Sequence, residues 1–480
     1  MPERYQIETE SAPPRFRPVG RLGIVDWRED CAGCHNCVKR SCIYDLYRNE
    51  NAYLQGTRGF LDYVYQCKGC LSCVQNCTKA LLTRIVNPDY ERLGDEYYTP
   101  AIILVTWFQA ETGRIPVSGT GYGGPFAGRG FDAMWTDMSE IVRPTRDGIH
   151  GREYISTLVD IGRKPPFLRF NDGQVVGPAP ALIQSPLPIL LDCCVFQSGL
   201  SAKRASPRLR AAAVEVADRT GTWAVVPEEE IGEAFGPERH RVVPLLSEGD
   251  EGLNESLIRA SRMVEVRDSA RVFETIAKIK SLHRDVIVAI RVAVETGCAD
   301  RVSELAKQGA EVVHVVFDPH GREQGEVSGF KFQVSGSDAR HARTVLREIH
   351  GRLVEQAIRD EVTLIASGGI AVAEHMAKAI ICGADLVAID LPMIIALECR
   401  LCRGCERGQP CPVELQNIEH DYAVRRMTNL LAAWHLQLLE VMGAMGMREV
   451  RRLRGETGRA MFHDDLEREI FAPLFANPET

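Results

Sequence analysis

Sixteen cysteines stand in this 480-residue chain, and twelve of them fall into three short clusters. The clusters read CAGCHNCVKRSC (31–42), CKGCLSCVQNC (67–77) and CRLCRGCERGQPC (399–411). Each opens with cysteines three positions apart, so that thiolates on one tight loop can hold three corners of an iron–sulfur cube. The chain begins without an apolar leader, and in a cytoplasmic protein this spacing favours metal ligation over disulfides.

The first two clusters are expected to share their ligands. In two-cluster ferredoxins the fourth cysteine of each run crosses to the other cluster. This rule predicts one 4Fe–4S cluster on Cys31, Cys34, Cys37 and Cys77, and another on Cys67, Cys70, Cys73 and Cys42. Ile43 and Thr78 replace the usual following proline, which leaves the ligand count intact. Two structural zinc sites are the alternative, although zinc needs only paired CxxC motifs.

The third cluster offers four further ligands in one loop. They are Cys399, Cys402, Cys405 and Cys411. The other four cysteines are expected to pack in the core, because free cysteine is often buried. They are Cys193, Cys194, Cys298 and Cys382.

Between the second and third clusters, short apolar runs alternate with helical stretches. The expected strands are 188–193, 223–226, 241–245, 263–266, 286–292, 312–317, 362–366 and 386–390. Helix-like segments between them include 206–221, 270–282, 299–309 and 373–383. Eight alternations predict an α/β fold, a (β/α)8 TIM barrel. Apolar residues at helical spacing from 417 to 453 predict a C-terminal helical extension that packs on the barrel or on a partner.

The ends of the last strands are candidates for a phosphate site. The loops after strands seven and eight of such barrels usually grip a phosphate, and glycine lets backbone amides approach it. The candidate residues there are Ser367, Gly368, Gly369, Ile389 and Asp390. A plain strand-to-helix turn explains the glycines equally well. Arg291 is expected near the mouth, paired either with a flavin ring or with a neighbouring acid. His320 is a weaker candidate.

Composition excludes several classes of function. A net charge of −8 gives no sign of a nucleic-acid-binding face. There is no run of about 20 apolar residues, so we expect no membrane span. The GTGYGG run (119–124) follows no clear strand and leads into no helix, which argues against a dinucleotide site. We expect a cytoplasmic protein without a nicotinamide domain of its own.

The cysteine clusters, the barrel and the ASGGI loop (366–370) together resemble the FMN-binding synthase domain of glutamate synthases, especially the compact archaeal-type form. The segments PPRFRPVGRLGIVDWREDC (13–31) and 121–165 carry the most specific part of the resemblance. The resemblance implies FMN in the barrel and an iron–sulfur centre on the third cluster. Better-known members use three cysteines and a 3Fe–4S centre; Cys402 is an additional candidate here, so the centre is 4Fe–4S or 3Fe–4S.

The chain departs from the family's pattern at several strand ends. The GAMSFG-like run after the first strand reads DCCVFQ (192–197), and the GEGG loop reads PEEE (227–230). The segment that supplies the substrate site reads VEVRDSARVFE (264–274), and the DGGTG run reads DPHGREQG (318–325). Arg291 stands where the family has lysine, and the two are not interchangeable at a positioned site. The carboxylates of PEEE are expected to repel a dicarboxylate substrate.

Two hypotheses follow. In the first, the chain relays electrons between ferredoxin-type clusters and an FMN-type barrel within a multi-subunit oxidoreductase, and no longer forms glutamate. In the second, it is a genuine glutamate synthase core that receives ammonia from a partner. Both imply a hetero-oligomer with a redox partner (ferredoxin or an NAD(P)H-oxidising subunit) and room for an amidotransferase subunit. The expected parts are a ferredoxin-like module (1–95), a linker (96–175), the barrel (176–398) and a cluster loop with C-terminal helices (399–480).

Overall fold

The computed structural model describes most of the chain outside the N-terminal cysteine region. The described residues are 5–16, 19–20, 26–27, 40–41, 43, 70–78, 82–83, 86–115, 128–137, 155–164, 170–171, 174–175, 182–194, 207–231, 241–247, 253–324, 339–405 and 407–471.

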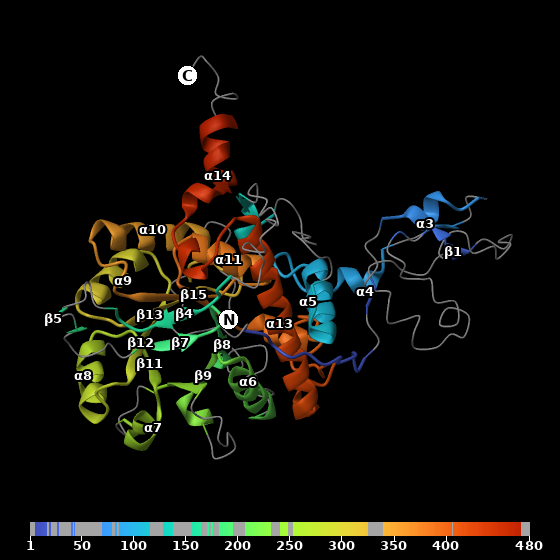
Figure 1. Ribbon diagram of the computed structural model, residues 1–480. Coiled ribbons are helices and arrows are strands. Elements are labelled where there is room, and N and C mark those ends of the chain that lie inside the picture. The colour runs from blue at the N-terminus through green and yellow to red at the C-terminus, as the bar shows by residue number, and fades with distance from the viewer. Residues whose placement is uncertain are drawn as a thin grey trace.

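Eight parallel strands close into one barrel, as the alternating pattern predicts (Figure 1). They are β8 (Ile189–Asp192), β9 (Trp223–Pro227), β10 (Val242–Leu245), β11 (Met263–Arg267), β12 (Ile287–Ala293), β13 (Val312–Val316), β14 (Thr363–Ser367) and β15 (Leu386–Ile389). β15 pairs with β8, which closes the ring. Nearly every strand residue is buried, because the lumen packs against one face of the strands and the helices against the other.

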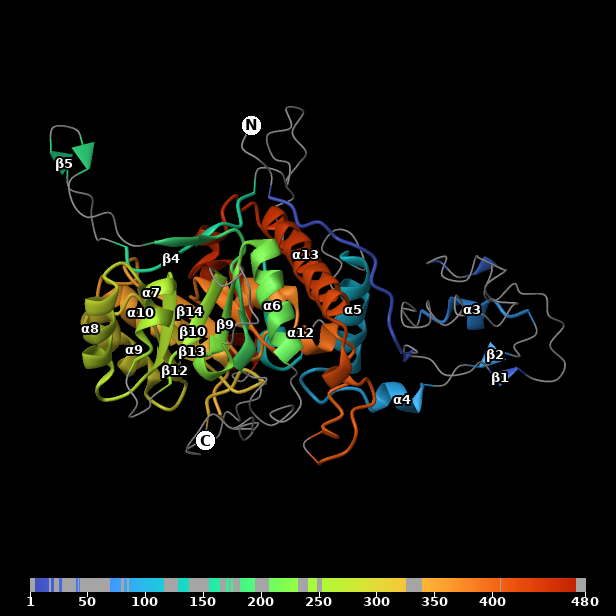
Figure 2. The same cartoon turned by 90° about the horizontal axis from the view of Figure 1, so that it is seen from below.

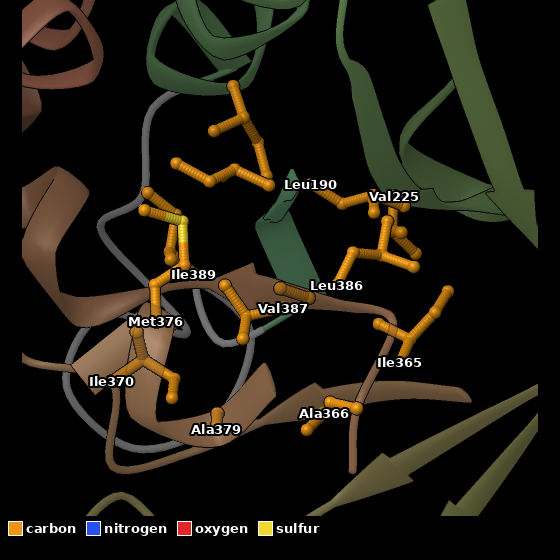
Figure 3. Close-up of a cluster of buried hydrophobic side chains, with 14 of the residues drawn as sticks. Leu190, Val225, Ile365, Ala366, Ile370, Met376, Ala379, Leu386, Val387 and Ile389 are labelled. Atoms are coloured by element: carbon orange, nitrogen blue, oxygen red, sulfur yellow. The ribbon is translucent and has the colours of Figure 1, made fainter. Parts of the chain in front are cut away.

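Helices form the outer layer of the barrel (Figures 1 and 2). They are α6 (Pro207–Thr220), α7 (Glu255–Ala260), α8 (Val272–Leu282), α9 (Cys298–Lys307), α10 (Ala342–Glu355), α11 (Ala373–Ile381) and α12 (Leu391–Ala396). Figure 3 shows part of the core, where Ile370, Met376 and Ala379 gather beside Val387 and Ile389 of β15. The predicted bounds of the eight strands and of the four helices expected between them agree with the structure to within two residues, whereas the helical run predicted at 417–453 is shorter in the structure, at His420–Ala444.

Two helices outside the barrel cover its flank. α13 (His420–Ala444) packs against α5 (Pro100–Thr112), α6, α11 and α12. α5 begins at Pro100, where the Thr99 hydroxyl accepts a hydrogen bond from the Ile102 amide, and ends at Gly113 in a left-handed conformation. The apolar stripe predicted near the C-terminus is therefore buried within the chain itself.

Smaller elements surround this body. The antiparallel pair β4 (Val159–Ile161) and β7 (Ile183–Ser185) lies at the N-terminal ends of the strands, where the Thr363 hydroxyl bonds both backbone groups of Gly162. Further two-stranded pairs are β3 (Met134–Thr136) with β16 (Ala460–Phe462) and β5 (Phe170–Asn171) with β6 (Gln174–Val175). α14 (His463–Leu466) follows β16.

The described N-terminal elements lie beyond α5, away from the barrel (Figures 1 and 2). They are β1 (Asp26–Trp27), α3 (Ser72–Gln75), β2 (Leu82–Thr83) and α4 (Pro88–Glu91). None of the helices in the described ranges is both long enough and apolar enough to cross a membrane.

Candidate functional site

Four ionisable side chains from four strands meet inside the barrel. Arg291 (β12) donates to Asp192 (β8) over 2.6 Å and lies 3.5 Å from both carboxylate oxygens of Glu265 (β11). His314 (β13) places its Nδ1 2.7 Å from a Glu265 oxygen. None of the four is more than 4% exposed. Of the two partners that the sequence leaves open for Arg291, the structure has the neighbouring acid; contact with a flavin stays a prediction.

The charges of these groups stabilise one another. Burial by itself raises the pKa of Asp192, but the charges of Arg291 and His314 outweigh it and hold that pKa below its ordinary value. Burial disfavours the guanidinium too, yet Asp192, Cys194 and Glu265 raise the pKa of Arg291. Buried charges of this kind are stable only when they are paired, because removing one partner leaves the other charge buried and uncompensated.

Two further groups lie within the electrostatic reach of this network. Burial, and then the charge of Asp192, raise the pKa of Asp390 from 3.8 to about 7, although Asp390 accepts a hydrogen bond from the Leu391 amide. The pKa of the Cys194 thiol is raised by burial and by the Asp192 charge. The charge of Asp192 therefore influences both groups at the C-terminal ends of the strands.

The two glycines of the ASGGI loop are required by backbone packing. Gly368 has φ +93°, and a Cβ there would lie 2.4 Å from the Asp318 carbonyl oxygen. Gly369 has φ +72°, and its Cβ would lie 2.6 Å from the Cα of Gly321. A side chain at either position would thus collide with the loop after β13. This packing accounts for both glycines, and the phosphate role predicted for them stays a prediction.

Several buried polar atoms at this end of the barrel have no hydrogen-bond partner among the described residues. They are Ser367 Oγ, Tyr98 Oη, His314 Nε2 and His320 Nδ1. A buried polar group without a partner costs about 1–3 kcal/mol, so native proteins rarely leave one without a ligand or water. Ser367 ends β14, and the pKa of Tyr98 is raised by burial and then by the Asp390 charge, which places both residues near the same strand ends.

The third cysteine loop (398–412) directly follows α12. Its backbone is left-handed at three residues that are not glycine, Glu398, Leu401 and Arg403, with φ of 73°, 48° and 53°. Alternation of this kind turns successive amides toward one side, a geometry found at many iron–sulfur sites. The pKa of Cys399 is raised to about 12 by burial and by the charges of Cys411, Cys402 and Cys405. The other three thiols therefore lie within electrostatic reach of Cys399.

No group of three or more His, Cys, Asp or Glu side chains in the described ranges could hold a metal ion. Of the N-terminal ligand candidates, Cys70 and the α3 region with Cys73 and Cys77 are described. Leu71, beside Cys70, has a left-handed φ of 58°, as Leu401 has beside Cys402. The other candidates lie outside the described residues: Cys31, Cys34, Cys37, Cys42 and Cys67.

Residues 94–98, which we call the strap, join the third cysteine loop to the barrel. The Gly94 amide donates to the Arg400 carbonyl over 2.9 Å. One Asp95 oxygen lies 3.3 Å from Arg403 Nη2 and 3.0 Å from His320 Nε2. Burial raises the pKa of Asp95, but the hydrogen bond and charge of His320 outweigh it and lower that pKa to about 2.

The strap also contacts the ASGGI loop. The Tyr97 hydroxyl donates to the Gly369 carbonyl over 2.6 Å, and the Tyr97 ring stacks on His320 with centroids 5.2 Å apart. His320 is 3% exposed, so it lies inside this contact. Strap, third cysteine loop and strand ends thus form one continuous set of contacts.

The three glutamates of PEEE have partners nearby. Glu230 pairs with Arg210, and Ser247 donates its amide to Glu228 over 2.9 Å and its hydroxyl to Glu229 over 3.4 Å. These bonds explain the glutamates as a local structural network of the loop after β9, without any need for a substrate.

Sequence patterns alone do not predict the partners of Arg291. Asp192, Glu265 and His314 fall within the expected apolar strands 188–193, 263–266 and 312–317. The available signal was an ionisable residue within a run that is otherwise apolar, because a charge buried in a strand requires a partner.

The comparisons with known proteins agree with this architecture. The family model "Conserved region in glutamate synthase" matches residues 251–448. The archaeal-type glutamate synthase [NADPH] of Dehalococcoides mccartyi is 24% identical, over 90% of this chain and 93% of its own. The protein of that name from Thermotoga neapolitana is 25% identical, over 88% and 91%. The archaeal glutamate synthase [NADPH] of Methanocaldococcus jannaschii is 24% identical, over 73% and 79%.

Among solved structures, a mandelate oxidase aligns over 76% of this chain and 91% of its own, with 16% identity and a TM-score of 0.41. The curated relatives match nearly end to end, and the matched family region spans strands β11 to β15, the third cysteine loop and α13. Over most of its length the chain is therefore similar to archaeal-type glutamate synthases, and residues 251–448 match the glutamate synthase family model.

Proposed function

We propose that this protein is a cytoplasmic iron–sulfur flavoprotein subunit that relays electrons between ferredoxin-type clusters and an FMN-type barrel in a multi-subunit oxidoreductase. The observation that carries the proposal is the contact between the third cysteine loop and the strand ends through the strap. A cluster on that loop would be attached to the barrel by Asp95, which binds Arg403 on one side and His320 on the other.

The barrel residues fit a bound flavin. Ser367 Oγ and Tyr98 Oη are buried hydrogen-bonding atoms without partners among the described residues, as expected where a polar ligand is missing. Ser367, the Gly368–Gly369 backbone, Ile389 and Asp390 would hold the group. When bound, FMN exchanges two electrons, whereas an iron–sulfur cluster passes one. With a pKa of about 7, Asp390 can hold or release a proton near neutral pH.

The thiol donors support clusters, because soft thiolates are the ligands of iron–sulfur centres. We assign two 4Fe–4S clusters to the N-terminal cysteines and one 4Fe–4S or 3Fe–4S cluster to Cys399, Cys402, Cys405 and Cys411. Ligation requires deprotonated thiols, so loading of the loop should release protons. Electrons would come from a partner, either a ferredoxin or an NAD(P)H-oxidising subunit.

The test is anaerobic purification followed by iron, sulfide and released-flavin quantitation on one sample. We expect about twelve irons and about one FMN per chain. About twelve irons per chain without flavin would support the electron-relay role of the clusters and contradict FMN binding in the barrel. Zinc in place of iron would overturn the proposal.

A second candidate is a genuine glutamate synthase core. The observation that favours it is the near end-to-end match to relatives named archaeal-type glutamate synthase [NADPH]. It predicts that the reduced protein is reoxidised by 2-oxoglutarate with ammonia and that glutamate forms. Reoxidation without glutamate, or none at all, would favour the electron-relay proposal.

A further inference from the structure

The salt bridge between Arg291 and Asp192 crosses the interior of the barrel. In the closed strand order β8 and β12 stand four positions apart in either direction, so they are opposite walls. The two side chains still meet at 2.6 Å, and they are 4% and 1% exposed. A bond between opposite walls that is shielded from solvent can only run through the interior.

A second carboxylate holds the same guanidinium. Glu265 places both of its oxygens 3.5 Å from Arg291 Nη1 and one of them 2.7 Å from His314 Nδ1. The cation is thus shared by two acids, and the second acid also contacts the imidazole. A guanidinium held between two carboxylates has little positive potential left for an incoming anion.

The charge of Asp192 also reaches two neighbouring groups. It raises the pKa of both Asp390 and the Cys194 thiol, in each case in addition to burial. A ligand carboxylate entering here would face Asp192 and Glu265 around one cation that is already paired.

One buried atom of the network itself offers a hydrogen bond to a ligand. His314 Nε2 has no partner among the residues that the structure describes, while the other ring nitrogen of His314 contacts Glu265. It suits a hydroxyl, carbonyl, amide or amine of a ligand.

We propose that Asp192 is a specificity-determining residue, which neutralises Arg291 so that the inner end of the mouth accepts an uncharged or amine-bearing group and rejects a carboxylate. This inference rests on the proposed function, because the ligand is taken to be the molecule that reacts at the barrel mouth. It assigns a substrate class other than the dicarboxylates: small molecules that lack a carboxylate at the end that enters the barrel.

The experiment is calorimetric titration of 2-oxoglutarate into the wild type, Asp192→Asn, and the matched double variant Asp192→Asn/Arg291→Met. Asp192→Asn retains the side chain's shape and removes its charge, so we expect its affinity for 2-oxoglutarate to rise at least tenfold over the wild type. The double variant should lose that gain. A wild type that binds 2-oxoglutarate as tightly as Asp192→Asn does, or an Asp192→Asn protein without any gain, would overturn the inference.

Circular dichroism checks that each variant folds. If Asp192→Asn does not fold, the wild type and Arg291→Met decide the question. If the wild type binds 2-oxoglutarate with a submillimolar dissociation constant and Arg291→Met abolishes that binding, the inference is overturned. If the wild type shows no such binding, the inference is upheld. Iron and flavin contents are measured on the same samples, so a failure of the proposed function appears as missing cofactor, independently of anion binding.

Discussion

Asp390 directly follows the last barrel strand, and its carboxyl group is buried close to Asp192. The pKa of Asp390 is about 7 in the folded protein and near the ordinary value of 3.8 in the unfolded chain. At pH values between these two, the folded protein keeps the carboxyl proton and the unfolded chain has released it. Between these two values the folded state binds more protons than the unfolded state. The free energy of unfolding therefore falls as pH rises from about 4 to about 7.

We predict that the free energy of unfolding of Asp390→Asn does not fall in this way between pH 4 and pH 7. The interval between the two pKa values corresponds to at most about 4 kcal/mol, so the variant should exceed the wild type in stability at pH 8 by up to that amount. Urea unfolding at pH 4 to 8 measures it, with the exposed Asp89 of α4, changed to Asn, as the control. Parallel curves for wild type and Asp390→Asn would contradict the prediction.

Gly368 gives a second prediction, because its missing side chain makes room for the backbone of the next loop. Gly368→Ala would place a methyl group 2.4 Å from the Asp318 carbonyl oxygen, and we expect a loss of about 2–4 kcal/mol. Gly297→Ala is the matched control: its φ is +87°, but no atom lies within 4 Å of the added carbon. That variant should lose only about 1 kcal/mol. Thermal denaturation measures both losses of stability. Equal losses in Gly368→Ala and Gly297→Ala would show that the left-handed backbone conformation, and not the contact with Asp318, determines the cost.

Among the secondary-structure elements, α13 holds the N-terminal segment, α5 and α12 together. Arg426, 1% exposed in the middle of α13, donates to the backbone carbonyls of Ala396 at 2.5 Å, Ala12 at 2.8 Å and Trp107 at 3.2 Å. Three segments far apart in the sequence therefore share one guanidinium. Asn429, one turn later, adds bonds to the carbonyls of Glu10 and Ala110.

We predict that Arg426→Lys loosens this junction. Lysine cannot reproduce the planar fork, so at least one buried carbonyl would be left without a donor, at a cost of about 2–4 kcal/mol. Amide exchange of residues 5–16 should accelerate more than exchange in the barrel strands. Arg425→Lys serves as the control, because Arg425 is about two-fifths exposed and lies 4.0 Å from Glu10. If amide exchange of residues 5–16 is unchanged in Arg426→Lys, Arg426 does not hold these segments together.

Across the molecule, the strap joins the third cysteine loop to the barrel. We predict that Cys402→Ser lowers the iron content by about one per chain, because a loop with three thiolates supports a 3Fe rather than a 4Fe centre. Cys382→Ser, a buried core position, should leave the iron content unchanged. Iron analysis with electron paramagnetic resonance measures both, and an unchanged content in Cys402→Ser would exclude Cys402 as a ligand.

The barrel, its strands and the long C-terminal helix can be predicted from local patterns in the sequence. Apolar runs and helical periodicity are local, so the pattern predicts a strand at 286–292, and β12 lies at Ile287–Ala293. The spacing of the cysteines likewise indicated ligand sets without any contact between distant residues.

Local patterns do not predict the partners of Arg291, the reason that Gly368 and Gly369 are glycines, or the contact between the strap and the third cysteine loop. Asp192 lies 99 residues from Arg291, and Asp95 lies 225 from His320 and 308 from Arg403. Partners at such separations are set by barrel closure and loop packing, which no local pattern records. Burial creates these pairs, because each charge is solvated in the unfolded chain and requires a partner only once the closed barrel removes it from water.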